Sequence, residues 1–160
     1  ACLPSLEFKV KWPNDIFYGN KKLAGILIES TKNNNANAMI IGIGINVNDD
    51  KKKQKLNNAY ACLHDLAPHG IAYENIIANI INEIQINLQQ FEQHGLTQFI
   101  EIWKQYDYCH NQAITVETNQ REISGISQGI NANGELVLSL ANNETILIHS
   151  GKIEYLNPAA

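Results

Sequence analysis

The spacing of apolar residues changes near residue 107, and this change is the strongest constraint on the fold. From residue 73 to 92 apolar residues recur every three or four positions, as on one face of a helix. The stripe is Ile76, Ile80, Ile84, Leu88 and Phe91. After Asp107, short runs of alternating polar and apolar residues are separated by turn-forming residues, which is typical of closely spaced strands. The sequence therefore predicts an α+β chain with two different parts.

The part before the change is predicted to hold a small sheet and three helices. Alternation and apolar runs predict strands at 7–12, 23–29 and 38–47 in an antiparallel meander. The last of these is nearly all apolar, so it is predicted to be central and covered on both faces. A short helix is expected at 59–66, and longer helices at 73–92 and 96–106.

The part after the change is predicted to be a small β-barrel. Strands are expected at 113–118, 122–130, 135–140, 145–149 and 152–156. Short strands at such close spacing are typical of a barrel. The expected domains are therefore residues 1–109 and residues 110–160.

Composition excludes several classes of partner. The net charge is −4 and Lys and Arg are spread along the chain, which argues against nucleic acid as the main partner. No apolar stretch approaches the roughly 18 residues that span a bilayer, so no membrane partner is expected. The 3 cysteines form no CxxC pair and the 5 histidines lack ligand spacing, so no metal site is predicted. A reducing cytoplasm is the simplest location.

Three motifs follow one another closely in the first part of the chain. They are Lys-Trp-Pro-Asn-Asp-Ile at 11–16, Lys-Leu-Ala-Gly-Ile-Leu-Ile-Glu at 22–29 and Gly-Ile-Gly-Ile-Asn-Val-Asn at 42–48. The glycines of the third motif lack the third glycine and the following helix of a dinucleotide-binding fingerprint. In this order and spacing the motifs closely resemble the catalytic core of biotin–protein ligases. Segments 91–96 and 125–134 resemble later parts of the same family.

This resemblance implies a fold and a reaction. The fold is part of a class II synthetase-like mixed sheet with helices, followed by a small SH3-like β-barrel. The enzyme would be a biotin–[acetyl-CoA-carboxylase] ligase, which forms biotinyl-5′-AMP from biotin and ATP, with Mg²⁺ accompanying ATP. It would then transfer biotin to a lysine of the biotin carboxyl carrier protein of acetyl-CoA carboxylase. A homodimer is a further implication.

The resemblance also assigns roles to residues of the second motif. Lys22 would be the cation that stabilises negative charge on the mixed anhydride, a role that a fixed cation serves well. An ordinary exposed lysine after a turn is the alternative. Biotin would lie against Gly25 and Ile26, where a missing side chain allows close approach to the strand. A bulge or packing glycine is the alternative for Gly25.

Three polar residues complete the predicted site. Asn14 and Asn46 resemble the asparagines that contact the adenylate, since an amide offers a donor and an acceptor to the adenine edge. Asp15 resembles the acidic residue near the carrier lysine and would help that lysine to lose a proton. The alternatives are a turn former for Asn14, a strand-end cap for Asn46 and a turn cap for Asp15.

The family's glycine- and arginine-rich loop, which wraps biotin and the phosphates, is expected before Glu7. The 160 residues do not contain it, and the one arginine, Arg121, falls in the predicted barrel. We therefore expect this portion to be inactive alone. Two other hypotheses remain, a non-catalytic interaction or dimerisation module and a lipoate-type acyl-adenylate transferase.

Overall fold

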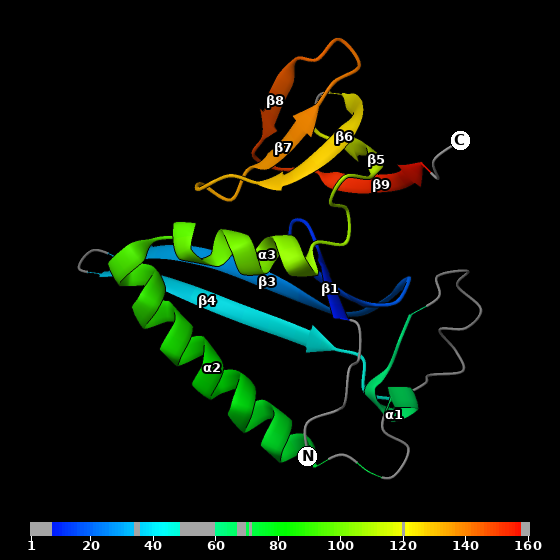
Figure 1. Ribbon diagram of the computed structural model, residues 1–160. Helices are drawn as coiled ribbons and strands as arrows, with labels where there is room; N and C mark the ends of the chain where they lie inside the picture. Colours follow the sequence, from blue (N-terminus) through cyan, green and yellow to red (C-terminus); the bar gives the residue numbers. More distant parts are fainter. Residues whose placement is uncertain are drawn as a thin grey trace. The chain divides into compact units, whose positions relative to one another are not determined.

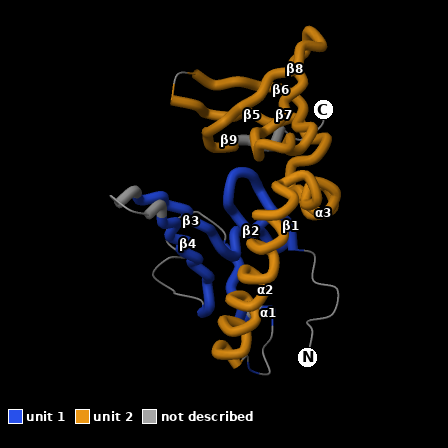
Figure 2. The backbone as a smooth tube through the Cα atoms, turned by 90° about the vertical axis from the view of Figure 1, so that its left-hand side faces the viewer, with its two compact units in different colours: residues 1–71 blue, residues 72–160 orange. Residues whose placement is uncertain are grey.

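The computed structural model describes residues 8–33, 36–48, 60–66, 70, 72–119 and 121–157. The chain divides into two compact units, residues 1–71 and residues 72–160 (Figure 2). The domain boundary expected near residue 110 is a different division of the chain, and it stays a prediction. Each unit is described by itself below.

Unit 1 contains a four-stranded antiparallel sheet (Figure 1). In sheet order its strands are β1 (Phe8–Lys11), β2 (Asp15–Tyr18), β3 (Lys21–Asn33) and β4 (Ala36–Ile45). The predicted meander is confirmed, but the sequence reading missed β2. This strand has 4 residues between two turns, too few for alternation to be visible.

The prediction that the apolar strand is central and covered on both faces is wrong for the described residues. β4 stands last in the sheet order and pairs with β3 alone. Met39 and Ile40 on β4 are 61% and 57% exposed, and Leu27 and Ile28 on β3 are 59% and 58% exposed. An apolar run shows that a strand is suited to burial on both faces, but it does not identify what covers them.

The buried end of the unit 1 sheet lies near the start of β3. Every ladder of unit 1 is antiparallel, and the parallel pairing among the described residues is an isolated bridge between Lys22 and Tyr60. The expected helix at 59–66 is shorter, α1 (Leu63–Leu66). The core of unit 1 comprises Trp12, Leu23, Ala24, Ala61, Cys62 and Leu63.

Unit 2 begins with the predicted long helix, α2 (Tyr73–His94). Gly95 ends it with a φ of 68°, and its N–H donates to the Phe91 carbonyl at 2.8 Å, as expected of a glycine C-cap. The second predicted helix is divided into a 3-10 turn, η2 (Thr97–Phe99), and α3 (Ile100–Tyr106). None of the described helices is both long and apolar enough to cross a membrane.

The remainder of unit 2 is a five-stranded antiparallel sheet close to the predicted strands. In chain order these are β5 (Ala113–Glu117), β6 (Glu122–Ile130), β7 (Leu136–Ser139), β8 (Thr145–Ile148) and β9 (Lys152–Asn157). The sheet order is β8-β7-β6-β5-β9, and the described ladders include no pairing of β8 with β9. The hydrogen-bonded sheet is therefore open, where a barrel was expected. Its core includes Ile114, Val116, Leu136, Leu138 and Ile153.

Gly125 on β6 sits where a side chain has no room. A Cβ at this position would lie 2.6 Å from the Ser139 carbonyl oxygen and 2.8 Å from Leu138 Cγ. We expect Gly125→Ala to lower the free energy of unfolding by about 1–3 kcal/mol, the usual range for overpacking. Urea denaturation followed by tryptophan fluorescence and far-UV circular dichroism measures it. Gln128→Ala, at an exposed position of the same strand, is the control and should stay close to wild type.

Candidate functional site

The first and second motifs meet in the β2–β3 ladder, and β3 carries a bulge at its start. Ile16 pairs with Ala24 and Phe17 pairs with Lys22, so Leu23 is an extra residue on β3. Residues directly opposite each other share a face of the sheet, and positions i and i+2 share a face along a strand. Lys22 therefore shares the face of Phe17 and Asp15, although strict alternation along β3 would place it opposite Gly25.

Three of the predicted site residues lie together on that face. Asp15 pairs with Gly25 across the β2–β3 ladder, and Lys22 Nζ forms an ion pair with Asp15 Oδ1 at 2.5 Å. A Cβ on Gly25 would lie 3.3 Å from Lys22 Nζ and 3.4 Å from Asp15 Oδ1. The lysine side chain is 47% exposed and the aspartate 26%. A cation, a carboxylate and a bare strand backbone thus form one partly open cluster.

A second glycine continues this bare surface onto the neighbouring strand. Gly44 on β4 pairs with Gly25, and Gly42 pairs with Leu27 two residues further along. Gly44 shares the face of Asp15, because Asp15, Gly25 and Gly44 are paired in one row of the sheet. Leu27 and Gly42 share that face, because they lie two positions further along the same strands. The third motif therefore supplies glycines beside the Lys22 cluster, which leaves space for a ligand to lie against the strands.

Asn14 and Ile26 bind each other through a pair of hydrogen bonds. Asn14 Nδ2 donates to the Ile26 carbonyl at 2.5 Å, and the Ile26 N–H donates to the Asn14 carbonyl at 2.9 Å. The Ile26 side chain points to the face opposite Gly25, because neighbouring residues alternate along a strand. Any contact between Ile26 and a ligand on the Lys22 face would therefore use its backbone.

Asn46 also directs its side chain to the backbone of β3. Its Nδ2 donates to the Lys22 carbonyl at 3.1 Å, and its backbone N–H donates to the Leu23 carbonyl at 2.9 Å. The strand-end alternative weighed for this residue thus corresponds to an observed contact. Its proposed contact with an adenylate stays a prediction.

The sequence analysis did not include in the site a segment that binds the backbone of Lys22 and Asn46. The Ala61 N–H donates to the Lys22 carbonyl at 3.0 Å, and the Leu63 N–H donates to the Asn46 carbonyl at 3.0 Å. Ala61, Cys62 and Leu63 are buried. The available signal was the apolar run 59–63 after a polar stretch, which was assigned to a helix instead.

The described residues offer no group of three or more His, Cys, Asp or Glu side chains that could hold a metal ion. Asp15, the carboxylate of the cluster, is paired with Lys22. The cluster thus holds a positive and a negative side chain beside the backbone of Gly25.

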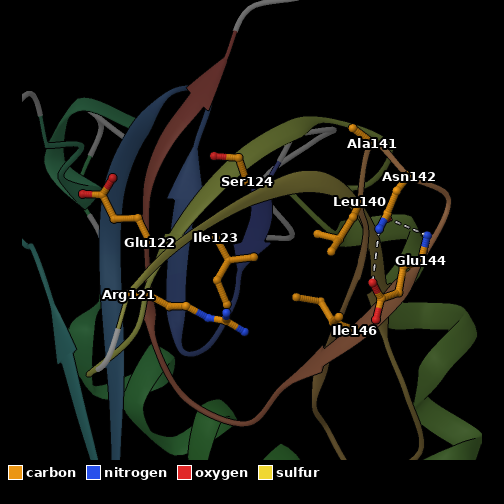
Figure 3. Close-up of a pocket in the computed structure, with 9 residues that line it drawn as sticks. All are labelled: Arg121, Glu122, Ile123, Ser124, Leu140, Ala141, Asn142, Glu144 and Ile146. Atoms are coloured by element: carbon orange, nitrogen blue, oxygen red, sulfur yellow. Dashed lines mark hydrogen bonds between the residues drawn. The ribbon is translucent and has the colours of Figure 1, made fainter.

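Unit 2 has a separate surface hollow of about 620 Å³ (Figure 3). Ile123, Leu140 and Ile146 form its apolar part, and Arg121 lies at one side. On the other side Asn142 and Glu144 bind each other through hydrogen bonds of 3.2 and 3.0 Å. None of the residues with a predicted role lines this hollow, so we do not assign the site to it.

Two family profiles match the chain. Residues 4–46 match the Biotin/lipoate A/B protein ligase family, and residues 110–155 match the Biotin protein ligase C terminal domain. Among curated proteins, the Bifunctional ligase/repressor BirA of Escherichia coli (strain K12) is 35% identical over 134 residues, 82% of this chain and 41% of BirA. BirA of Salmonella typhimurium is 34% identical over 136 residues, 82% of this chain and 42% of that protein. The chain thus spans about two fifths of these relatives.

A solved structure shares the fold. The biotin protein ligase from Aquifex aeolicus in complex with biotin and ATP superposes with a TM-score of 0.77 at 22% identity, covering 92% of this chain and 61% of that one. At this identity the match shows the fold, which agrees with the predicted class of a sheet with helices followed by an SH3-like domain.

Proposed function

This chain belongs to the biotin protein ligase family, and on that premise we propose that it supplies the Lys22 side of a biotinylation site. The site would form biotinyl-5′-AMP from biotin and ATP and then transfer biotin to a lysine of a carrier protein. One observation carries the proposal. Lys22 Nζ and Asp15 Oδ1 lie beside the backbone of Gly25, on a face where Gly44 continues the unobstructed surface.

In the first step a carboxylate oxygen of biotin attacks the α-phosphorus of ATP, and pyrophosphate leaves. Negative charge on the carboxylate and the phosphate must be held at close quarters. We assign this to Lys22, whose side chain lies on the Asp15 face because of the bulge and is 47% exposed, so a ligand can reach it. Mg²⁺ would arrive as the ATP complex.

In the second step the amine of the carrier lysine attacks the acyl carbon, and AMP leaves. The incoming lysine is protonated in solution and must lose a proton before it can attack. Asp15 is the carboxylate of the cluster, and it can attract the ammonium group and accept a proton from it. The proposed carrier is the biotin carboxyl carrier protein of acetyl-CoA carboxylase.

We further propose that a polypeptide of residues 1–160 alone does not complete this reaction. Leu27 and Ile40, on the same face as Gly25, are more than half exposed. A site that excludes water would need these side chains covered, because electrostatic stabilisation weakens in bulk solvent. The polypeptide thus supplies one side of the site.

A ligand titration tests the proposed site. We expect a stable biotinyl-adenylate analogue, with a sulfamate in place of the phosphate, to shift the NMR amide signals of Lys22, Gly25 and Ile26. The reason is that Lys22 and Gly25 lie on the open face, and the backbone of Ile26 follows Gly25 directly along the strand. The equivalent lipoyl analogue is the comparison ligand. Stronger shifts with the lipoyl compound would favour the lipoate-type transferase, and shifts confined to unit 2 would contradict the site.

A carrier assay tests completeness. The chain is incubated with biotin, Mg-ATP and an apo carrier domain, and the mass of the carrier is measured. We expect no biotin-sized gain from a chain that circular dichroism shows to be folded. A gain would overturn the incompleteness proposal while supporting the ligase function.

One observation favours a second candidate, an interaction or dimerisation module. β4 ends the described sheet order and carries the exposed Met39 and Ile40, and unpaired sheet edges promote strand pairing between chains. Sedimentation of the free chain over a range of concentrations tests it, since a module of this kind would self-associate without biotin or ATP.

A further inference from the structure

We propose that Asn46, the residue that follows β4, acts through Lys22 as a positioning residue that clamps the β3 bulge by hydrogen bonds. The inference deepens the proposed function, because it concerns how that site holds its cation. It differs from the adenylate contact suggested by the resemblance, since the partner of the Asn46 side chain is the chain itself. Clamping and direct ligand contact predict different outcomes for the same substitution.

The first support is that Asn46 binds both carbonyls of the bulge. Its Nδ2 donates to the Lys22 carbonyl at 3.1 Å and its backbone N–H to the Leu23 carbonyl at 2.9 Å. A bulge leaves an extra residue outside the regular ladder, so its carbonyls need partners of this kind. Asn46, the residue that follows β4, therefore holds two consecutive peptide groups of the bulge, and the first of them is bonded to the Lys22 Cα.

The second support is the buried segment 61–63, which forms hydrogen bonds with both Lys22 and Asn46. The Ala61 N–H supplies the second hydrogen bond to the Lys22 carbonyl at 3.0 Å, and the Leu63 N–H donates to the Asn46 carbonyl at 3.0 Å. Ala61 and Leu63 are 5% and 8% exposed. Hydrogen bonds thus connect Lys22, Asn46 and this segment to one another, and the segment is buried in the core.

The amide nitrogen of Asn46 serves as the hydrogen-bond donor to the Lys22 carbonyl. A carboxylate has nearly the shape of an amide but cannot donate a hydrogen bond. Placed at this position, it would bring an oxygen against the Lys22 carbonyl oxygen. Asn46→Asp therefore removes the donor and keeps the volume, whereas Asn46→Ala removes both.

The first experiment needs no ligand. Amide hydrogen exchange and NMR signals of Ala61, together with the side-chain signals of Lys22 and Asp15, are compared between wild type, Asn46→Ala and Asn46→Asp. We expect both variants to speed exchange at Ala61 about two- to tenfold, which corresponds to the loss of one ordinary hydrogen bond. The Lys22 and Asp15 side-chain signals should shift with it. The control is Asn48→Ala, an exposed asparagine two residues along the chain.

Unchanged Ala61 exchange and unchanged Lys22 signals in a folded Asn46→Ala variant would overturn the proposal. So would wild-type behaviour of Asn46→Asp, because the donor would then be unnecessary.

The second experiment is a double-mutant cycle on the affinity for the biotinyl-adenylate analogue, with Asn46→Ala, Lys22→Ala and the pair. If Asn46 acts through Lys22, its substitution weakens binding in the wild-type background and has little further effect once Lys22 is gone. Additive losses would mean direct contact with the ligand and would overturn the proposal. A wild-type chain that does not bind the analogue would count against the proposed function, and the ligand-free experiment would still decide the role of Asn46.

Discussion

Lys22→Ala will weaken binding of a biotinyl-adenylate analogue about ten- to a hundredfold while leaving the chain folded. A hydrogen bond to a charged group contributes about 1.5–3 kcal/mol, and each 1.4 kcal/mol is a factor of ten in affinity. The fold should tolerate the change, because the lysine side chain is 47% exposed and its ion pair with Asp15 is partly open to solvent, which weakens such pairs. Calorimetric or NMR titration gives the affinity, and circular dichroism checks the fold.

Lys21→Ala is the matched control. Lys21 is the preceding residue on the same strand and is also exposed, but it pairs with Tyr18 at the turn. We expect its substitution to leave analogue binding unchanged. Equal losses for the two lysines would mean that general positive charge attracts the ligand, and the specific role of Lys22 would then be wrong.

Gly25→Val will weaken analogue binding and leave the free energy of unfolding nearly unchanged. The added side chain would occupy the surface against which biotin is proposed to lie, so we expect the analogue affinity to fall at least tenfold. The free energy of unfolding should change little. The nearest atoms to an added Cβ are the ends of the Lys22 and Asp15 side chains, at 3.3–3.4 Å, and these can move. Valine also suits a strand. Analogue titration and urea denaturation on the same samples measure the two quantities.

Gly42→Val is the comparison for this substitution. Gly42 lies on the same face of the sheet, and an added Cβ would meet Leu27 at ordinary contact distances of 3.7 and 4.0 Å. It is two ladder positions from Gly25, so we expect a smaller loss of affinity. If Gly25→Val bound the analogue as wild type does, biotin could not lie against this strand as proposed.

The elements that the sequence predicted well are those with long or regular patterns. The helix α2 has 22 residues of helical period, and the five strands of unit 2 each lie between clear turn residues. β2 escaped notice because Asp15–Tyr18 shows one alternation at most. The position of β4 was misjudged because apolar character reports what a strand can bury against, whereas sheet order depends on pairing with distant residues.

The resemblance named the members of the candidate site, but it did not give their geometry. It assigned Lys22, Gly25 and Asp15 to one site, and these three residues lie together in the structure. Alternation alone would have put Lys22 and Gly25 on opposite faces, and the bulge that corrects this has no recognisable signal in the sequence. The sequence also did not predict what the Asn14 and Asn46 amides bind, because an asparagine side chain can form hydrogen bonds with a ligand or with a backbone carbonyl.

Because of the bulge, the face that Lys22 occupies depends on β3 having one residue more than β2 between the pairs Ile16–Ala24 and Phe17–Lys22. Inserting one residue between Ile16 and Phe17, opposite Leu23, would restore regular pairing, and every residue of the β3–β4 ladder could keep its partner. Lys22 would then emerge on the far side of the sheet from Asp15. The orientation of this lysine is thus encoded by chain length. A scan of point substitutions would not reveal that dependence, whereas a single-codon insertion in β2 would.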